Sequence, residues 1–377
     1  MIGPYPESPD RIDGGVAAAT MYLSQALTSR PGVELIGARI ARRGDESRED
    51  NALGWPVVDL PLGRLSLSTF YRRQRRRLEN LLRRYDPNIV HGQGSDLAGF
   101  LAVGCGRPAV VTVHGLLGEC ARYQTDPANK LRAALAARLT ERRTIRRATD
   151  LIAISPYVAR YYCADISGRI HDIPNPVAPE FFHLRRRPER GRLLFAGRIA
   201  NGKGLLELLH AVARNASSVT KLVLAGATPD AAYGAQLRRE ADKLGLTDCV
   251  QFAGLLAEPE ILEEFARAET LVLPSHQETA PMVVQQAMAA GLAVIATTVG
   301  GIPYQIQHDV SGLLFEAGDV GNLAGLIGRL GRDATLSRRL GEAAKTIATT
   351  RYQASAVADA TLAVYRTALG LAHSHVS

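Results

Sequence analysis

A glycine-rich loop, residues 197–204 (GRIANGKG), carries two cations where they could bind a phosphate group. The loop nearly matches the pattern G-x-x-x-x-G-K-[ST], but Gly204 replaces the Ser or Thr whose hydroxyl coordinates Mg²⁺. Arg198 and Lys203 remain, on a turn that follows an apolar run typical of a buried strand. This pair suits a diphosphate whose charge is neutralised by side chains rather than by a metal ion.

A second stretch, residues 274–303 (PSHQETAPMVVQQAMAAGLAVIATTVGGIP), carries one carboxylate, Glu278. Its pattern predicts a strand end, a loop, a helix that Gly291 ends, and another buried strand. Pro281 suits the first helical position, because proline has no N–H to lose there. Free backbone N–H groups at this helix start belong to Thr279, Ala280 and Met282. A helix start beside the carboxyl ends of parallel strands favours phosphate or sugar oxygens.

Strands and helices alternate along the rest of the chain, which predicts parallel, doubly wound sheets of the α/β class. A length of 377 residues suits two domains, and the non-periodic segment 174–191, rich in Pro and Arg, is the predicted linker. We expect an N-terminal domain over 1–182 and a C-terminal domain over 183–353, with a helix in 354–377 that crosses back to the first. The periodicity also predicts a strand over 33–40 and helices over 69–84 and 128–147.

Two features of the first half could serve a site. Gly14 and Gly15 precede a predicted helix and would let the backbone approach an anionic ligand, although an ordinary turn explains them equally well. His91 and His114 each end an apolar strand and precede a glycine. We favour a functional role for His114 and a satisfied structural role for His91, with the opposite assignment left open for each.

Composition excludes several classes of protein. Four cysteines stand far apart without a CxxC pair, which argues for a reducing compartment and against a zinc site or a disulfide framework. No leader-like segment follows Met1, and no apolar run approaches the ~18 residues of a membrane helix. We therefore expect a cytoplasmic protein, with a peripheral position on the inner face of the plasma membrane as the open alternative.

The formal net charge of +8 gathers in two arginine-rich helical segments, Arg72–Arg84 and Arg138–Arg147. A solvated helix face is the simplest explanation of both segments. Attraction to an anionic membrane surface or a phosphorylated acceptor is the functional alternative. Nucleic acid is not an expected partner, because no aromatic interleaving or binding motif accompanies the charge.

At this point the chain resembles the retaining glycosyltransferases of family 4, which have the two-domain GT-B fold, with two Rossmann-like domains facing across a cleft. The most specific matching segments are GRIANGKG, FAG (252–254), PSHQE, QAMAAGLAVIATTVGGIP and SGLLF (311–315). Gly14-Gly15, TVHG (112–115) and IPNPV (173–177) fit the N-terminal half less specifically. The resemblance spans nearly the whole chain.

The resemblance implies a role for each residue of a donor site. Arg198 and Lys203 would bind the diphosphate and stabilise the leaving group, Glu278 would contact the donor sugar, and His114 would lie near that sugar. The other implied donor-binding positions are Gly15 at the cleft floor, Gly254 and Leu255 near the base, and Thr279, Ala280, Pro281, Met282, Val283 and Gln286. No metal and no cofactor are implied beyond the nucleotide-sugar co-substrate.

Two residues depart from the family pattern. Gln286 stands where the family has a second Glu that holds the ribose, so a charge-assisted hydrogen bond is lost. Tyr304 stands where many members have Glu. We expect transfer of a hexose-type sugar to a glycan or lipid-linked acceptor, in cell-surface or exopolysaccharide synthesis. A P-loop-like ATP or GTP hydrolase and a non-catalytic sugar-nucleotide or glycan-binding protein remain as alternatives.

Overall fold

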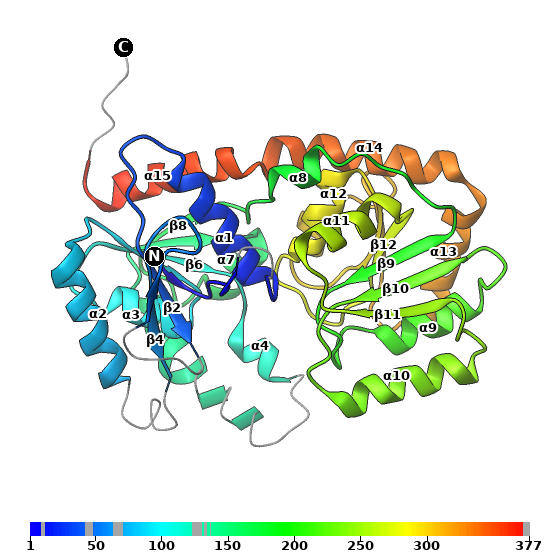
Figure 1. Ribbon diagram of the computed structural model, residues 1–377, viewed down its shortest axis with the longest axis horizontal. Coiled ribbons are helices and arrows are strands. Elements are labelled where there is room, and N and C mark those ends of the chain that lie inside the picture. The colour runs from blue at the N-terminus through cyan, green and yellow to red at the C-terminus, as the bar shows by residue number, and fades with distance from the viewer. Residues whose placement is uncertain are drawn as a thin grey trace, which may run out of the picture. The chain divides into compact units, whose positions relative to one another are not determined.

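The computed structural model describes residues 1–8, 12–41, 48–62, 71–122, 130–131, 134–135 and 137–371. These residues form two compact units (Figure 1). The N-terminal unit comprises residues 1–8, 16–176 and 354–371, and the C-terminal unit comprises residues 12–15 and 177–353. Each unit is built around its own sheet.

The sheet of the N-terminal unit has the strand order β3-β4-β2-β1-β5-β6-β7-β8, and only the edge pair β3–β4 is antiparallel. The strand bounds are β1 (Ile2–Gly3), β2 (Gly37–Ala41), β3 (Glu49–Asp50), β4 (Val57–Pro61), β5 (Val90–Gln93), β6 (Ala109–Val113), β7 (Asp150–Ala153) and β8 (Arg169–Asp172). The two-residue strand β1 lies between β2 and β5, where Ile2 pairs with Ala38 on one side and Gly92 on the other.

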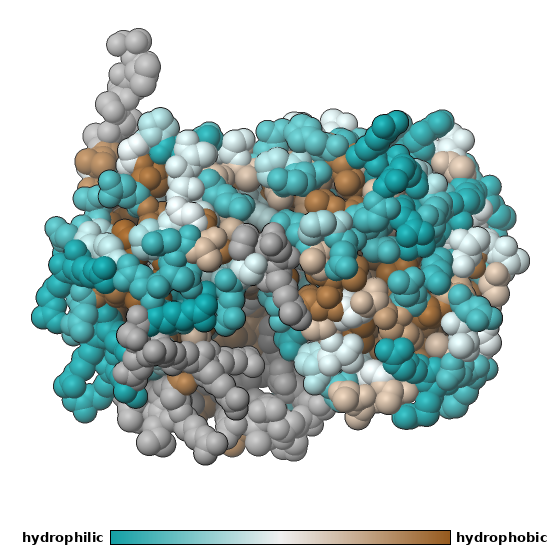
Figure 2. Space-filling view, in the orientation of Figure 1, coloured by the Kyte–Doolittle hydropathy of each residue, from teal (hydrophilic) through white to brown (hydrophobic). Residues whose placement is uncertain are grey.

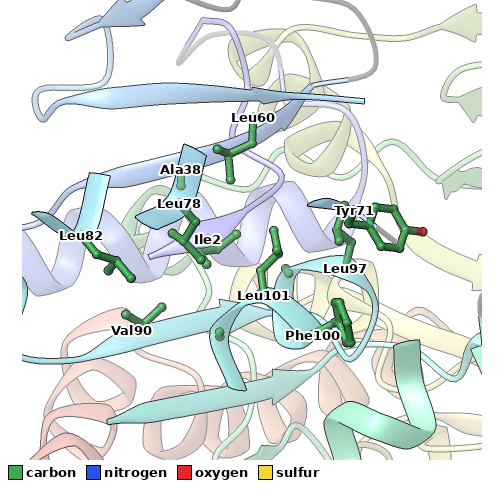
Figure 3. Packing of buried hydrophobic residues seen from close by; sticks show 12 residues of the cluster. Ile2, Ala38, Leu60, Tyr71, Leu78, Leu82, Val90, Leu97, Phe100 and Leu101 are labelled. Carbon is green, nitrogen blue, oxygen red and sulfur yellow. The ribbon is translucent and has the colours of Figure 1, made fainter. Parts of the chain in front are cut away.

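Helices cover both faces of this sheet. Their bounds are α1 (Gly15–Thr28), α2 (Arg72–Tyr85), α3 (Leu97–Val103), α4 (Leu117–Arg122), the π-helix η1 (Ala137–Glu141), α6 (Arg142–Arg147), α7 (Pro156–Tyr162) and α15 (Ala354–Ala368). On one face Leu78 and Leu82 of α2 pack with Ile2 and Val90 of the sheet (Figure 3). On the other face α1 and α15 cover β6 and β7. The core therefore lies on both sides of the short central strand.

The sheet of the C-terminal unit has the order β11-β10-β9-β12-β13-β14, and every pair is parallel. The strand bounds are β9 (Arg192–Ala196), β10 (Lys221–Ala225), β11 (Val250–Gly254), β12 (Thr270–Leu273), β13 (Ala293–Thr297) and β14 (Leu313–Phe315). The order reverses between β9 and β12, so their carboxyl ends form the topological switch point at which open α/β sheets bind ligands.

Two groups of helices flank this second sheet (Figure 1). One group contains α9 (Leu205–Ala213), α10 (Ala231–Lys243) and α13 (Val320–Arg332). The other contains α8 (Pro179–Phe182), α11 (Glu258–Arg267), α12 (Met282–Ala290) and α14 (Ala334–Arg351). A short 3₁₀-helix, η2 (Ile302–Tyr304), follows β13.

The structure changes several predicted bounds. The segment 177–182, expected in the first domain, belongs to the C-terminal unit, because Phe181 of α8 is buried edge-on against Phe265 at a centroid distance of 5.1 Å. The strand expected from residue 33 begins only at Gly37. Gly37 N–H donates to the Pro56 carbonyl, and Ala38 N–H donates to the Met1 carbonyl.

The two predicted arginine-rich helices also differ from the structure. Residues 69–70 of the first prediction and residues 128–129, 132–133 and 136 of the second lie outside the described residues. Within 128–147, residues 137–141 form a π-helix, which turns the carboxylate of Glu141 inward to accept from the Leu117 N–H and the Ser95 hydroxyl. A π-helix of this kind inserts an extra residue into an α-helix, which periodicity alone does not reveal.

Candidate functional site

Lys203 and Glu278 meet at the switch point of the second sheet. Their loops leave the carboxyl ends of β9 and β12, which are neighbours in the sheet. Lys203 Nζ donates to Glu278 Oε1 at 2.6 Å, and the two side chains are 28% and 13% exposed. The tertiary structure thus brings together the two loops that the sequence singled out.

Gly204 forces the conformation of the first loop just before α9. Its φ of 65° lies in the left-handed region, and a Cβ added there would lie 2.1 Å from the Pro274 carbonyl oxygen. Because only glycine fits, this position could not carry the Ser or Thr of a nucleotide hydrolase without moving β12's exit loop. The geometry therefore disfavours the hydrolase alternative.

Arg198 lies on a turn whose backbone is held on both sides. Gly197 N–H donates to the carbonyl of Ala225, the last residue of β10, and Ile199 N–H donates to the carbonyl of Ala227, each at 2.9 Å. A Cβ added to Gly226 would lie 1.9 Å from the Gly197 carbonyl oxygen, so β10's exit packs directly on the turn. The side chain of Arg198 itself is exposed. A cation on a rigid turn is available to an incoming anion.

The residues predicted at the start of α12 follow Glu278 in the loop between β12 and α12. Thr279, Ala280, Pro281 and Met282 are buried, whereas Val283 and Gln286 are half-buried. Pro281 precedes the helix as its N-cap residue instead of being the first helical residue, with φ −64° and ψ 122°. Gly301 N–H donates to the Glu278 carbonyl at 3.3 Å, which ties the loop to the turn after β13.

Gly254 is the last residue of β11, and Leu255 follows it. Strand β11 pairs with β10, so both residues lie at the carboxyl edge of the same sheet. Gly254 accepts from Gly226 N–H at 2.7 Å and has a φ of 70°. Leu255 is half-buried. The ends of β9, β10 and β11 are therefore linked by backbone hydrogen bonds beside Arg198.

His114 lies at the carboxyl end of β6 in the N-terminal unit. Its Nε2 is 2.7 Å from Gln93 Oε1, and its Nδ1 is buried without a hydrogen-bond partner among the described residues. Burial lowers the pKa of His114 to about 4, although nearby Asn175 opposes the shift. Since an amide oxygen only accepts, Nε2 carries the proton and Nδ1 is an acceptor. His114 is thus a neutral hydrogen-bonding group at pH 7.

His91 has the structural role. Its ring nitrogens lie 2.7 Å from the Tyr365 hydroxyl and 2.7 Å from the Thr112 hydroxyl, and the ring is buried. Burial lowers the pKa of His91 well below its usual value. Gly15, predicted to bring the backbone close to a ligand, is the first residue of α1 and is exposed.

Sequence reasoning missed one histidine at the switch point. His276 N–H donates to the Gly202 carbonyl at 2.9 Å, and His276 Nε2 lies 2.8 Å from Glu207 Oε1 at the start of α9. His276 therefore links the Lys203 loop to the Glu278 loop. Its position two residues before Glu278 was the available signal.

The two departures from the family pattern lie close to this site in sequence but differ in setting. Gln286 lies on the second turn of α12. Tyr304 ends η2, and its carbonyl accepts from Arg351 at 3.0 Å. Within the described ranges, no cluster of three or more His, Cys, Asp or Glu side chains could hold a metal ion.

Comparison with known proteins extends over both units. The model described as Glycosyltransferase Family 4 matches residues 13–181, and the model described as Glycosyl transferases group 1 matches residues 178–347. MMP α-(1→4)-mannosyltransferase of Mycolicibacterium hassiacum is 28% identical over 305 residues, 76% of this chain and 72% of the relative. D-inositol 3-phosphate glycosyltransferase of Corynebacterium jeikeium is 33% identical over 172 residues, 44% of this chain. That match covers only 41% of the Corynebacterium protein.

Solved structures share the fold. Sucrose-phosphate synthase from Thermosynechococcus elongatus superposes with a TM-score of 0.79 at 21% identity, covering 98% of each chain. HepE from Anabaena, in complex with UDP-glucose, gives a TM-score of 0.74 at 19% identity, covering 97% of this chain and 98% of that one.

Proposed function

Because this chain belongs to glycosyltransferase family 4 and has the GT-B fold, we propose that it is a retaining transferase of a hexose-type sugar. Its donor is a nucleotide-diphospho-sugar, and its acceptor is a hydroxyl of a glycan or lipid-linked molecule. The names of similar proteins support this substrate class. They include a mannosyltransferase, a UDP-glucose complex and a glycosyltransferase involved in lipopolysaccharide biosynthesis.

The observation that carries the proposal is the juxtaposition of Lys203 and Glu278 beside exposed Arg198 at the β9–β12 switch point. Two cations there suit the diphosphate, and one carboxylate suits sugar hydroxyls. A helix start, that of α12, adds backbone donors.

The proposed chemistry follows from these groups. As the bond from C1 to the phosphate oxygen breaks, the acceptor hydroxyl oxygen bonds to C1 from the same face, and its proton passes to the departing phosphate oxygen. Arg198 and Lys203 stabilise the negative charge that grows on the diphosphate. Glu278 orients the sugar by accepting from its hydroxyls. We propose that the two cations make a divalent metal unnecessary.

The proposal also covers the acceptor and the place in the cell where transfer occurs. Among the described residues, no helix is long and apolar enough to span a membrane. Hydrophilic side chains gather over α2, where Arg72 and Arg76 are exposed (Figure 2, left). We propose that this helix lets the enzyme approach an anionic bilayer that carries lipid-linked acceptors. Cys105, Cys163 and Cys249 are free thiols, which suits a reducing, cytoplasmic setting.

The direct test compares donor use by the wild type and two site variants. Purified protein is screened with UDP-, GDP- and ADP-sugars by thermal shift and hydrolysis, and products with lipid-linked acceptors are identified by mass spectrometry. Arg198→Ala and Glu278→Ala should each lower transfer at least ~100-fold, the scale of one preorganised electrostatic contact. Reactions with and without EDTA test the metal independence.

Exposed Arg239 on α10 provides the matched control. Arg239→Ala should transfer like the wild type, which separates the site from a general loss of charge. Near-wild-type transfer by both site variants would refute the site. Donor binding without hydrolysis or transfer would instead support a non-catalytic binding protein.

A further inference from the structure

The ammonium of Lys203, which the proposed function assigns to the diphosphate, is paired with a carboxylate of the protein. Lys203 Nζ lies 2.6 Å from Glu278 Oε1. Lys203 has three N–H donors, so a phosphate oxygen either shares the ammonium with Glu278 or displaces that carboxylate to gain its full charge. The pair therefore competes with the very ligand that the proposed function assigns to it.

Backbone and side-chain contacts tie the two loops together, so we expect opening of the pair to involve the two side chains alone. Gly204 abuts the Pro274 carbonyl, and His276 N–H donates to Gly202 at 2.9 Å. The His276 ring and the Glu207 carboxylate, 2.8 Å apart, join the loops a second time. Lys203 is long enough to leave Glu278 without any shift of these loops.

We propose that Glu278 is an intramolecular competitor for Lys203 and thereby distinguishes the sugar donor from the free nucleoside diphosphate. This inference rests on the proposed function. With the donor bound, Glu278 accepts from sugar hydroxyls while Lys203 binds phosphate. After transfer those hydroxyls have left with the product sugar. Glu278 then recaptures Lys203, which weakens the hold on the nucleoside diphosphate and favours its release.

The size of the effect follows from the exposure of the pair. Partly exposed ion pairs are modest in strength, and their removal changes an equilibrium by about 2- to 5-fold. Arg198 is exposed and keeps its contact with the diphosphate in either state. The competition therefore tunes affinity for the nucleoside diphosphate without abolishing it.

The test is calorimetric titration of UDP, GDP and ADP into the wild type, Glu278→Gln, Lys203→Ala and the double variant. Glu278→Gln should bind the matching nucleoside diphosphate about 2- to 5-fold more tightly than the wild type, although it transfers sugar poorly. The double variant should show no such gain over Lys203→Ala, because the competition requires both residues. Glu278→Asp, whose carboxylate sits one methylene further away, should give a smaller gain.

Glu240 supplies the matched control. It lies on α10, where it meets Lys243 at 3.5 Å and His210 at 3.4 Å, so Glu240→Gln removes the same charge from a similar pair. Glu240→Gln should bind nucleoside diphosphate like the wild type.

Three outcomes would overturn the inference. The first is that Glu278→Gln binds nucleoside diphosphate no more tightly than Glu240→Gln does. The second is that the Glu278→Gln change raises this affinity equally in the wild type and in Lys203→Ala. Either leaves the proposed function intact, provided that Arg198→Ala and Glu278→Ala lose transfer. The third is a wild type that binds none of the three diphosphates, which would refute the inference together with the donor site.

Discussion

Gly204 decides how the phosphate-binding loop can be used, because its conformation and its contact both require glycine. Its φ is 65°, and Pro274 leaves no space for a Cβ. The residue that breaks the hydrolase pattern is thus the one that lets β9's loop lie against β12's loop. Lys203 reaches Glu278 as a consequence.

Gly204→Ser, which restores the hydrolase pattern, should therefore reduce stability and sugar transfer without creating Mg²⁺-dependent nucleotide hydrolysis. The left-handed backbone alone should cost about 1–2 kcal/mol, and displacement of Pro274 should add to this. Urea unfolding, a transfer assay and a phosphate-release assay measure the three effects.

Gly245 isolates the contact from the dihedral angle. Its φ is 67°, but nothing lies within 4 Å of an added Cβ. Gly245→Ser should therefore show only the backbone cost and keep transfer. Equal losses in the two variants, or new hydrolysis in Gly204→Ser, would contradict this account of the loop.

At the scale of elements, α2 presents two chemically different faces. Gln74, Leu78 and Leu82 are buried against the first sheet, whereas most of the arginines remain exposed. Some of these arginines have structural partners, since Arg84 meets Glu49 at 2.7 Å and Arg77 donates to the Asp59 carbonyl at 3.3 Å. Arg72 and Arg76 point to solvent. The face therefore combines structural ion pairs with a surface that could meet anionic lipid.

Substitution of Arg72 and Arg76 by Gln together should weaken binding to phosphatidylglycerol-containing vesicles by about 30-fold. Each cation near an anionic surface contributes about 1 kcal/mol. Cosedimentation with phosphatidylglycerol and with neutral phosphatidylcholine vesicles measures the difference.

The double substitution of Arg338 and Arg339 by Gln removes the same charge from α14, where both side chains are exposed. It should bind vesicles like the wild type. If all three proteins bind phosphatidylglycerol vesicles equally, the solvated-face explanation of α2 is favoured. The same holds if the wild type binds neutral phosphatidylcholine vesicles as strongly as phosphatidylglycerol vesicles.

At the scale of the molecule, buried histidines link stability to pH. Burial lowers the pKa of His114 to about 4, and His91 shifts in the same direction. Between about 6.5 and 4 the unfolded chain binds a proton that the folded His114 does not, so stability rises with pH in this window. The contribution is fully present above pH 6.5 and is lost as pH falls toward 4.

We therefore expect the wild type to lose stability on acidification from pH 7.5 to pH 5, by about 2 kcal/mol from His114 alone. His114→Gln cannot take up this proton and should lose correspondingly less, as measured by urea unfolding at both pH values. His210→Gln, at an exposed site, should behave like the wild type. An equal loss in His114→Gln and the wild type would show that His114 is protonated in the folded state.

The sequence by itself determined the class of fold and most of the residues at the switch point. The alternation of apolar runs with amphipathic segments, and the glycines that end them, depend on neighbours along the chain, so a linear pattern reveals them. Arg198, Lys203 and Glu278 were found because each follows an apolar strand.

Strand order, which depends on how the chain crosses over, was decided only by the tertiary structure. It set β9 beside β12 and brought Lys203 and Glu278, 75 residues apart, to 2.6 Å. Burial among distant side chains likewise distinguished two histidines that each precede a glycine. His91 lies inside β5 and meets the hydroxyls of Tyr365 and Thr112, whereas His114 follows β6 and its Nδ1 has no hydrogen-bond partner among the described residues.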